Sequence, residues 1–368
     1  MPEPVATPLR YDPALETPEP DEAETQRGLV EQILRISRIT YQDGGHAMRG
    51  VHAKSHGIVT GELIVADGLP PALAQGLFAA PGRHAAILRF STSPGDLLDD
   101  RVSTPRGLAI KVFGVEGPRL PGSDGATTQD FVLINGKAFA TPTAKAFLAN
   151  LKLLAGTTDK AEGLKIALSA ALQGAETVVE ALGGESGLLK GLGGHPETHV
   201  LGESFFSAAP IRYGDHVAKI GVRPLSPALK ALTGAKVDLH GKPDGLREAV
   251  RDYFAGQAGE WEVVAQLCTD TDEMPIEDSH KAWPEDRSAY LPVARLVVPP
   301  QDAWSEAGGT TVNDALSFSP WHGLAAHQPL GSIMRVRKAV YQASAEFRLT
   351  ANHCPMHQPA GLAEAGLG

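Results

Sequence analysis

The sequence predicts an α+β fold in which an antiparallel eight-stranded β-barrel is surrounded by helices, packed outside it and at one end. Two stretches, residues 51–133 and 204–300, consist of short apolar runs that Gly and Pro interrupt, which is typical of strands. About eight strands at close spacing surround two helical insertions, which argues for an antiparallel barrel with helices packed outside it. With 368 residues, 42% of them hydrophobic, the chain is long enough for such a domain.

The first half of the chain contains an arm, one helix and four strands. Residues 1–26 are rich in Pro and Glu and lack periodicity, so we expect an extended arm that is mobile unless it packs on a neighbouring subunit. Apolar residues then recur at helical spacing from Gly28 to Tyr41. The strands are predicted at 57–67, 85–92, 108–115 and 130–135, with a short Pro-opened helix at 70–78.

The second half alternates helical and strand regions. Two helices are predicted at 141–156 and 160–182, strands at 204–226, 260–272 and 290–300, a helix at 245–256, and a long last helix that includes 335–348. The interior of an eight-stranded barrel is nearly filled by side chains. A large ligand is therefore expected at the wall, between the barrel and its helices.

Charge and composition exclude several classes of protein. A net charge of −10 disfavours a protein that binds nucleic acid through phosphate attraction. The beginning has no basic segment followed by an apolar one, and no apolar run is long enough to span a membrane. Two cysteines far apart in sequence indicate a reducing, cytoplasmic compartment.

One face of the last helix carries an unusual set of side chains. Because each helical residue advances about 100°, Tyr341 lies about 40° and Arg348 about 20° from Arg337. Cations beside a phenol favour the phenolate, and tyrosinate is a known axial ligand of haem iron. An amphipathic helix with one snorkelling Arg and a half-buried Tyr explains this segment equally well on its own.

Other segments decide between these readings. The Arg-x-x-x-Tyr spacing, with Arg seven residues later, resembles the ligand helix of catalases. Further segments resemble catalase motifs in the same order and cover roughly residues 40–350: MRGVHAKSHG (48–57), ILRFSTS (87–93), PRGLAIKVFGVEG (105–117), HKAWPEDRSAYLPVARLVV (280–298) and LSFSPW (316–321). The sequence is therefore similar to the catalase-like haem protein superfamily, and to its small catalase-related peroxidases.

The resemblance implies roles for individual residues. Tyr341 would be the axial ligand of haem b iron, with Arg337 as the cation that keeps it a phenolate. His52, in the V-H-A-K segment, would be the distal acid/base, Ser91 would orient its imidazole, and Val51 would narrow the approach to the iron.

Three arginines match the positions that bind the haem propionates in this family. Arg49, Arg89 and Arg348 suit that task because a guanidinium binds a carboxylate through two parallel hydrogen bonds. The ordinary alternative is three unrelated surface salt bridges.

The sequence departs from the family at the distal asparagine. Catalases carry this residue in G-N-N-T-P-V-F-F, and the corresponding stretch here is GATTQDFVLING. Ungapped placement puts Thr128 at the asparagine position and replaces the Phe pair by Val132 and Leu133. Either Thr128 or the nearby Asn135 is left to take the distal polar role.

The function that the resemblance implies is peroxide reduction. We expect a haem-dependent peroxidase that uses hydrogen peroxide or organic peroxides with a small reductant and has weak catalase activity. A haem-dependent fatty-acid hydroperoxide lyase or isomerase and a non-catalytic haem-binding protein are the alternatives; Val51 disfavours the coral-type allene oxide synthases, which have Thr there. We predict a haem domain over 27–352 and a tail over 353–368, without NADPH; the role of the HCPMH segment and a homo-oligomeric state stay open.

Overall fold

The computed structural model describes residues 6–155, 195–305, 309–353 and 358–367. Its strands form one sheet in the order β5-β4-β3-β2-β1-β9-β8-β7-β6, and β5 also pairs with β7. This second pairing closes an antiparallel barrel of eight strands, and β6 (Ile211–Tyr213) lies outside the ring as a hairpin with β7. The predicted fold class is thereby confirmed. The eight strands are β1 (Ser55–Val65), β2 (Gly82–Thr92), β3 (Arg106–Phe113), β4 (Thr128–Ile134), β5 (Phe205–Phe206), β7 (His216–Pro224), β8 (Gly259–Leu267) and β9 (Leu291–Val298).

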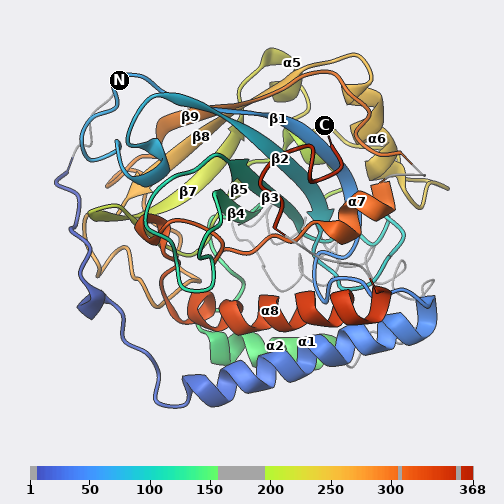
Figure 1. Cartoon of the computed structure of the whole chain (residues 1–368), viewed down its shortest axis with the longest axis horizontal. Coiled ribbons are helices and arrows are strands. Elements are labelled where there is room, and N and C mark those ends of the chain that lie inside the picture. The colour runs from blue at the N-terminus through green and yellow to red at the C-terminus, as the bar shows by residue number, and fades with distance from the viewer. Residues whose placement is uncertain (1–5, 156–194, 306–308, 354–357, 368) are drawn as a thin grey trace, which may run out of the picture.

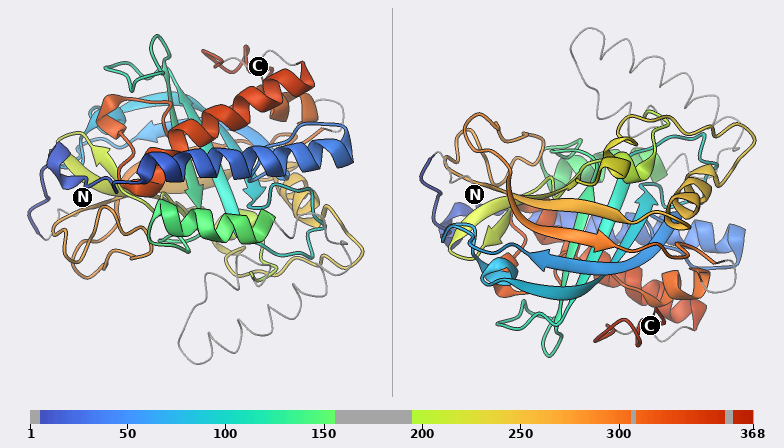
Figure 2. Two further views of the ribbon diagram at one scale, coloured as in Figure 1. Left: turned by 90° about the horizontal axis from the view of Figure 1, so that it is seen from below. Right: turned by 90° about the horizontal axis from the view of Figure 1, so that it is seen from above.

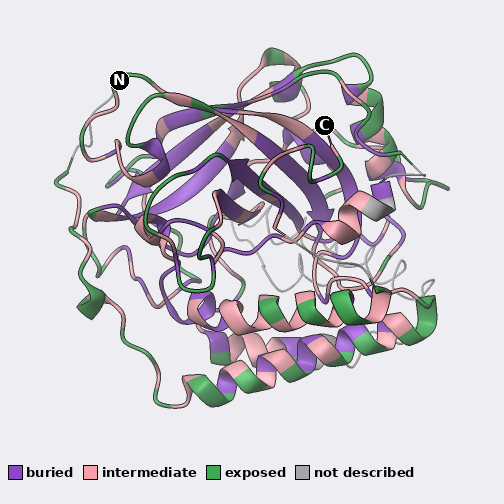
Figure 3. Ribbon diagram, in the orientation of Figure 1, coloured by how far each residue is buried: buried purple, intermediate pink, exposed green. Residues whose placement is uncertain are grey.

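Alternation along the strands builds two environments. On β2, Leu88 and Phe90 point into the barrel core, whereas Arg89 and Ser91 point out of the barrel. All four side chains are buried, because other segments cover this outer wall. Figure 3 shows the barrel strands as largely buried, while the helices below them keep exposed outer faces. The outer wall of the barrel can therefore hold a site away from solvent.

A layer of three helices lies across the barrel (Figures 1 and 2). It consists of α1 (Glu22–Gly44), α2 (Ala144–Ala155) and the last helix α8 (Ser332–Asn352). Leu29, Ile33 and Ile36 of α1 recur at helical spacing and pack in one apolar cluster with α2 and α8. The remaining helical segments are α5 (Pro227–Lys230), α6 (Gly245–Phe254), α7 (Gly309–Ala315) and the 3-10 turns η1 (Pro13–Leu15), η2 (Gly76–Phe78), η3 (Val200–Gly202) and η4 (Ala325–His327).

One predicted helix is absent from the described structure, and another lies outside the described residues. The segment 70–78 was expected to be a short helix, but it forms turns and the single 3-10 turn η2. Gly76 begins this turn with φ of 55°, where a Cβ would stand 2.5 Å from His327 Nε2, so the local chain bends tightly against the barrel core. The helix predicted at 160–182 lies outside the described residues.

The N-terminal arm packs on its own chain and is shorter than predicted. Helix α1 already begins at Glu22, inside the range expected to be extended. The Leu9 N–H donates to the Cys268 carbonyl at 2.7 Å, and the Leu9 and Leu15 side chains pack on an apolar cluster. Arg335 of α8 pairs with Glu16 of the arm at 2.7 Å. Apolar residues at 9, 11 and 15 thus give the arm a place on the barrel that its Pro-rich composition did not indicate.

The end of the chain also packs on the barrel. Gln358 Oε1 accepts a hydrogen bond from Lys111 Nζ at 2.8 Å, and Ala365 is buried in an outer apolar cluster with Phe318. Of the predicted HCPMH segment, residues 354–357 lie outside the described residues. No helix in the described part of the chain is long and apolar enough to cross a bilayer.

Candidate functional site

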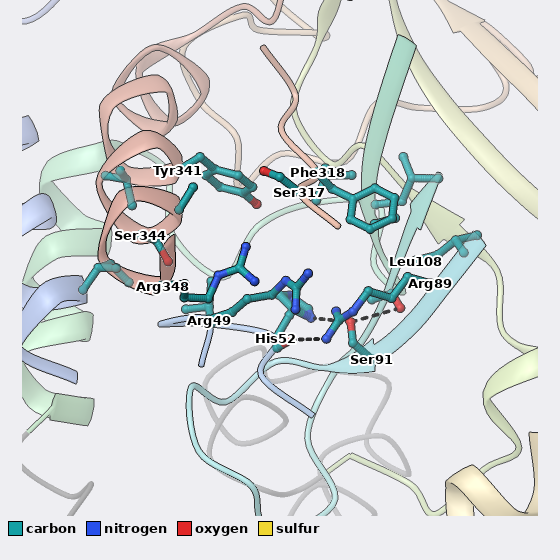
Figure 4. Close-up of a pocket in the computed structure, with 18 residues that line it drawn as sticks. Arg49, His52, Arg89, Ser91, Leu108, Ser317, Phe318, Tyr341, Ser344 and Arg348 are labelled. Carbon is teal, nitrogen blue, oxygen red and sulfur yellow. Dashed lines mark hydrogen bonds between the residues drawn. The ribbon is translucent and has the colours of Figure 1, made fainter. Parts of the chain in front are cut away.

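A pocket of about 680 Å³, its open mouth included, lies between the outer wall of the barrel and helix α8 (Figure 4). A large ligand was expected here, at the wall of the barrel, because side chains nearly fill the interior of an eight-stranded barrel. Its walls come from the loop before β1, from β2, β3 and β4, from the segment after α7, and from α1 and α8. The lining residues are Ile33, Arg49, Val51, His52, Arg89, Ser91, Gly107, Leu108, Ala109, Val132, Leu133, Ser317, Phe318, Val340, Tyr341, Ser344, Ala345 and Arg348.

Helix α8 presents a phenol to this pocket. Tyr341, Ser344 and Arg348 recur three to four residues apart and line one side of the pocket, as the helical spacing predicted. Arg337, one turn earlier, donates from Nη2 to the Tyr341 hydroxyl at 2.5 Å, and its guanidinium carbon lies 5.0 Å from the centre of the Tyr341 ring. A phenol oxygen that faces the pocket and is held by a guanidinium has the chemistry of a ligand for a ferric ion.

The N-terminus of α8 is held by several carboxylates. Glu277 Oε2 accepts from the Ser332 N–H at 2.8 Å, and Glu16 Oε1 accepts from the Gly331 N–H at 2.9 Å. The Arg335 guanidinium joins both of these acids to Glu22 of α1. Anions at the beginning of a helix are favourable. This network fixes the helix that carries Tyr341 to the arm and to α1.

His52 enters the pocket from the loop before β1. It adopts the left-handed backbone region with φ of 53°, and its N–H donates to the Ser93 carbonyl at 2.9 Å. The imidazole Nδ1 is 3.1 Å from Ser91 Oγ. Ser91 Oγ can in turn donate to the Gly107 carbonyl at 3.5 Å. This arrangement fits a neutral ring that carries hydrogen on Nδ1 and leaves the lone pair of Nε2 free.

The floor beneath His52 is a glycine. A Cβ on Gly107 would stand 2.5 Å from His52 Cε1 and 2.6 Å from His52 Nδ1, closer than real contacts allow. The close approach of the imidazole to β3 therefore requires Gly at this position.

The electrostatic surroundings keep the imidazole neutral. Burial, followed by the positive charges of Arg89, Arg337 and Arg49, lowers the pKa of His52 to about 3. At neutral pH the ring is therefore uncharged, with an unprotonated Nε2.

Three arginines converge at the edge of the pocket. Arg89 and Arg348 are 2% and 4% exposed, which is rare for guanidinium groups. Burial and the charge of Arg348 lower the pKa of Arg89 to about 9, and burial together with Arg89 and Arg348 lowers the pKa of Arg49 well below its usual value. Like charges held together in this way make a receptor for anions.

Most sequence-predicted site residues are brought together by the structure. Arg49, Val51, His52, Arg89, Ser91, Tyr341 and Arg348 line the pocket, and Arg337 contacts Tyr341. Thr128 was expected in the same site, but it does not line the pocket. It begins β4 opposite Phe113, whereas the pocket is formed where Val132 and Leu133 of β4 face Ala109 and Leu108 of β3.

The second candidate for the distal polar role is also elsewhere. Asn135 accepts from the Arg106 N–H at 2.8 Å, and its Nδ2 is 2.6 Å from His195 Nε2. It is not among the residues that line the pocket. Neither of the two residues that the sequence offered for this role therefore lines the pocket.

Sequence reasoning missed three hydrogen-bonding or wall residues. Ser317 and Phe318 form the wall next to Tyr341 in Figure 4. The Ser319 N–H that follows them donates to Asp130 of β4 at 3.0 Å, and the buried Lys111–Asp130 pair at 2.7 Å anchors this wall. Asn313 lies behind Arg49 and Arg89 and accepts hydrogen bonds from both. The LSFSPW motif contained the first two, but no pattern pointed to Asn313.

The donor set fits haem. A phenol paired with a guanidinium suits a ferric centre. Arg49 and Arg89, which share the uncharged acceptor Asn313, suit the carboxylates of the propionates. Apolar side chains such as Val51, Val132 and Leu133 line the space between these groups. No part of this set conflicts with a planar macrocycle that carries carboxylates on one edge.

Solved structures of catalases share this fold. Catalase A from Saccharomyces cerevisiae aligns with a TM-score of 0.59 and 17% identity over 88% of this chain and 66% of its own. A fungal catalase aligns with a TM-score of 0.58 and 17% identity over 87% of this chain and 63% of its own. A bacterial catalase aligns with a TM-score of 0.59 and 15% identity over 96% of this chain and 66% of its own. The chain thus spans slightly less than two thirds of the length of these catalases. No protein-family model matches the sequence, and no curated protein does. The resemblance found in the sequence is confirmed for the fold: this chain has the catalase fold.

Proposed function

We propose that this protein is a haem-dependent peroxidase that reduces hydrogen peroxide or organic peroxides with a small reductant and has only weak catalase activity. The observation that carries the proposal is the pairing of two groups across one pocket. Tyr341, hydrogen-bonded to Arg337, lies on the α8 wall, and His52, hydrogen-bonded to Ser91, lies on the barrel side. The first is suited to bind iron and the second to move a proton.

Tyr341 would bind the haem iron, and Arg49, Arg89 and Arg348 would bind the propionates. When bound, haem supplies the two electrons that reduce the O–O bond. His52 Nε2 takes the proton from one peroxide oxygen and returns it to the oxygen that leaves, so that ROOH yields ROH. Ser91 holds the imidazole in the orientation for both transfers. Two molecules of a one-electron donor AH would supply the reducing equivalents, so that the overall reaction is ROOH + 2 AH → ROH + H₂O + 2 A•.

The lining of the pocket favours peroxidation over dismutation. Dismutation requires a second hydrogen peroxide to be placed and oxidised in the same pocket. None of the described residues that line this pocket is Asn or Gln, so no carboxamide orients that molecule. Val132 and Leu133 are also smaller than the Phe pair that catalases carry at the corresponding positions, which leaves room for alkyl hydroperoxides.

We therefore expect donor oxidation to exceed oxygen release. The measurement compares oxygen evolution from hydrogen peroxide alone with oxidation of an added phenolic donor, using hydrogen peroxide and an alkyl hydroperoxide in parallel. Conversion of a fatty-acid hydroperoxide without any donor would favour the lyase or isomerase alternative. Vigorous oxygen evolution with negligible donor oxidation would contradict the proposal and indicate a short catalase.

Gly107 provides a test of the proton-transfer geometry. Gly107→Ala should push the His52 ring from Ser91, because the new Cβ occupies the space of Cε1 and Nδ1. A displacement of about 1 Å can cost roughly 10²-fold in rate, so we expect a slower reaction with peroxide at unchanged haem content. Stopped-flow spectroscopy measures this rate. Gly44→Ala is the matched control, because a Cβ at Gly44 meets nothing within 4 Å. Equal rates in both variants would show that the position of the His52 ring does not limit the reaction.

A further inference from the structure

Two of the pocket arginines share one hydrogen-bond acceptor. Asn313 Oδ1, in α7, accepts from Arg49 Nη1 at 3.0 Å and from Arg89 Nε at 2.8 Å. The Asn313 carbonyl accepts a third bond, from Arg49 Nη2 at 2.8 Å. Arg49 lies in the loop before β1 and Arg89 on β2, so a residue from a distant part of the chain links the two guanidiniums.

The acceptors around these two arginines are uncharged. Besides Asn313, Arg49 donates to the Leu316 carbonyl at 2.7 Å, and Arg89 donates to the carbonyls of His52 and Ala53 at 2.9 and 3.1 Å. Neutral acceptors satisfy N–H groups without cancelling the positive charge. That charge stays available for an anion in the pocket.

The neighbouring acid is engaged elsewhere. Asp314 Oδ2 is 2.7 Å from His46 Nε2, and the charge of Asp314 reaches Arg49 and Arg89 only through space. A carboxylate placed at 313 instead would form direct ion pairs with the two guanidiniums. The Asn–Asp order thus directs the amide to the arginines and the acid to His46.

We propose that Asn313 is a positioning residue for the propionate receptor: its neutral amide oxygen holds Arg49 and Arg89 in place for the two carboxylates of haem while preserving their charge. This inference rests on the proposed function. It predicts that Asn313 affects binding of the carboxylates and not of the macrocycle.

The experiment titrates apo-protein with haemin and with haemin dimethyl ester, whose two carboxylates are blocked, and follows absorbance. Asn313→Ala loses hydrogen bonds to charged groups and should weaken haemin binding about tenfold, with less than about a twofold change for the ester. Asn313→Asp, nearly the same shape, cancels charge and should weaken haemin binding further, again with little effect on the ester. Asp314→Asn is the matched control, because it removes the neighbouring acid and should not weaken haemin binding.

The outcomes separate this inference from the proposed function. Wild-type protein that binds neither ligand would overturn the proposed function, and this inference with it. Wild-type protein that binds haemin while both Asn313 variants retain wild-type affinity would overturn the inference alone. An equal loss of haemin and ester would also overturn it, because it would show general damage to the pocket. Because Asn313→Asp keeps the size of the side chain, the test does not depend on the stability of Asn313→Ala.

Discussion

Replacing Tyr341 by Phe is expected to abolish stable haem binding or to change the ligand state of any haem that remains. The substitution removes the oxygen that Arg337 contacts at 2.5 Å and leaves the aromatic ring in place. The pocket then keeps its arginine receptor but has no anionic ligand on the α8 wall. Haem content per protein and the absorption spectrum of the ferric state measure the effect.

A second Tyr→Phe change controls for loss of a hydroxyl. The Tyr253 hydroxyl donates to the Ala258 carbonyl at 2.9 Å and is not part of the pocket. Tyr253→Phe should therefore retain haem and its spectrum. Full haem content and an unchanged spectrum in Tyr341→Phe would contradict the assignment of Tyr341 as the axial ligand.

Replacing His52 by Ala is expected to slow the reaction with peroxide by about 10²–10⁴-fold, the usual contribution of a general acid–base group. Haem should remain, because His52 is not one of the groups assigned to bind it. His52→Asn is a useful second variant, since Asn tolerates the left-handed backbone at this position and lacks a base. Stopped-flow mixing with peroxide measures the rate. His84→Ala is the control, because His84 lies on β2 outside the pocket and bonds to the Phe113 carbonyl.

The pH dependence gives an independent check on His52. Its pKa of about 3 means that the neutral base persists far below pH 6.5, so the wild-type rate should be flat from about pH 8 to pH 5. A fall in rate around pH 6.5 would contradict the buried, neutral imidazole. The free energy of unfolding, unlike the rate, should change over this pH range. The unfolded state binds a proton at His52 near pH 6.5 and the folded state only near pH 3, so the contribution of His52 to stability is fully present above pH 6.5 and declines as the pH falls towards 3. Rates at low pH should therefore be measured after short pH jumps.

The sequence predicted the elements that depend on local periodicity. Short apolar runs interrupted by Gly and Pro revealed the strands of the barrel, and the helical period placed Tyr341 and Arg348 on one side of α8, where both line the pocket. Motif order along the chain brought His52, Ser91 and the arginines into the same candidate site. The strands and the helix face follow from residues close together in sequence, whereas the shared site was inferred from the resemblance of the ordered motifs to catalases.

Register and long-range contacts were decided only by the tertiary structure. The pairing of β3 with β4 puts Thr128 opposite Phe113, away from the pocket, although alignment of motifs had placed it there. Asn313 has no local pattern, because its function comes from two guanidiniums that lie 264 and 224 residues away in sequence. Side-chain periodicity determines which face a residue occupies, but the position along a strand and the partner across the pocket depend on how distant segments pack.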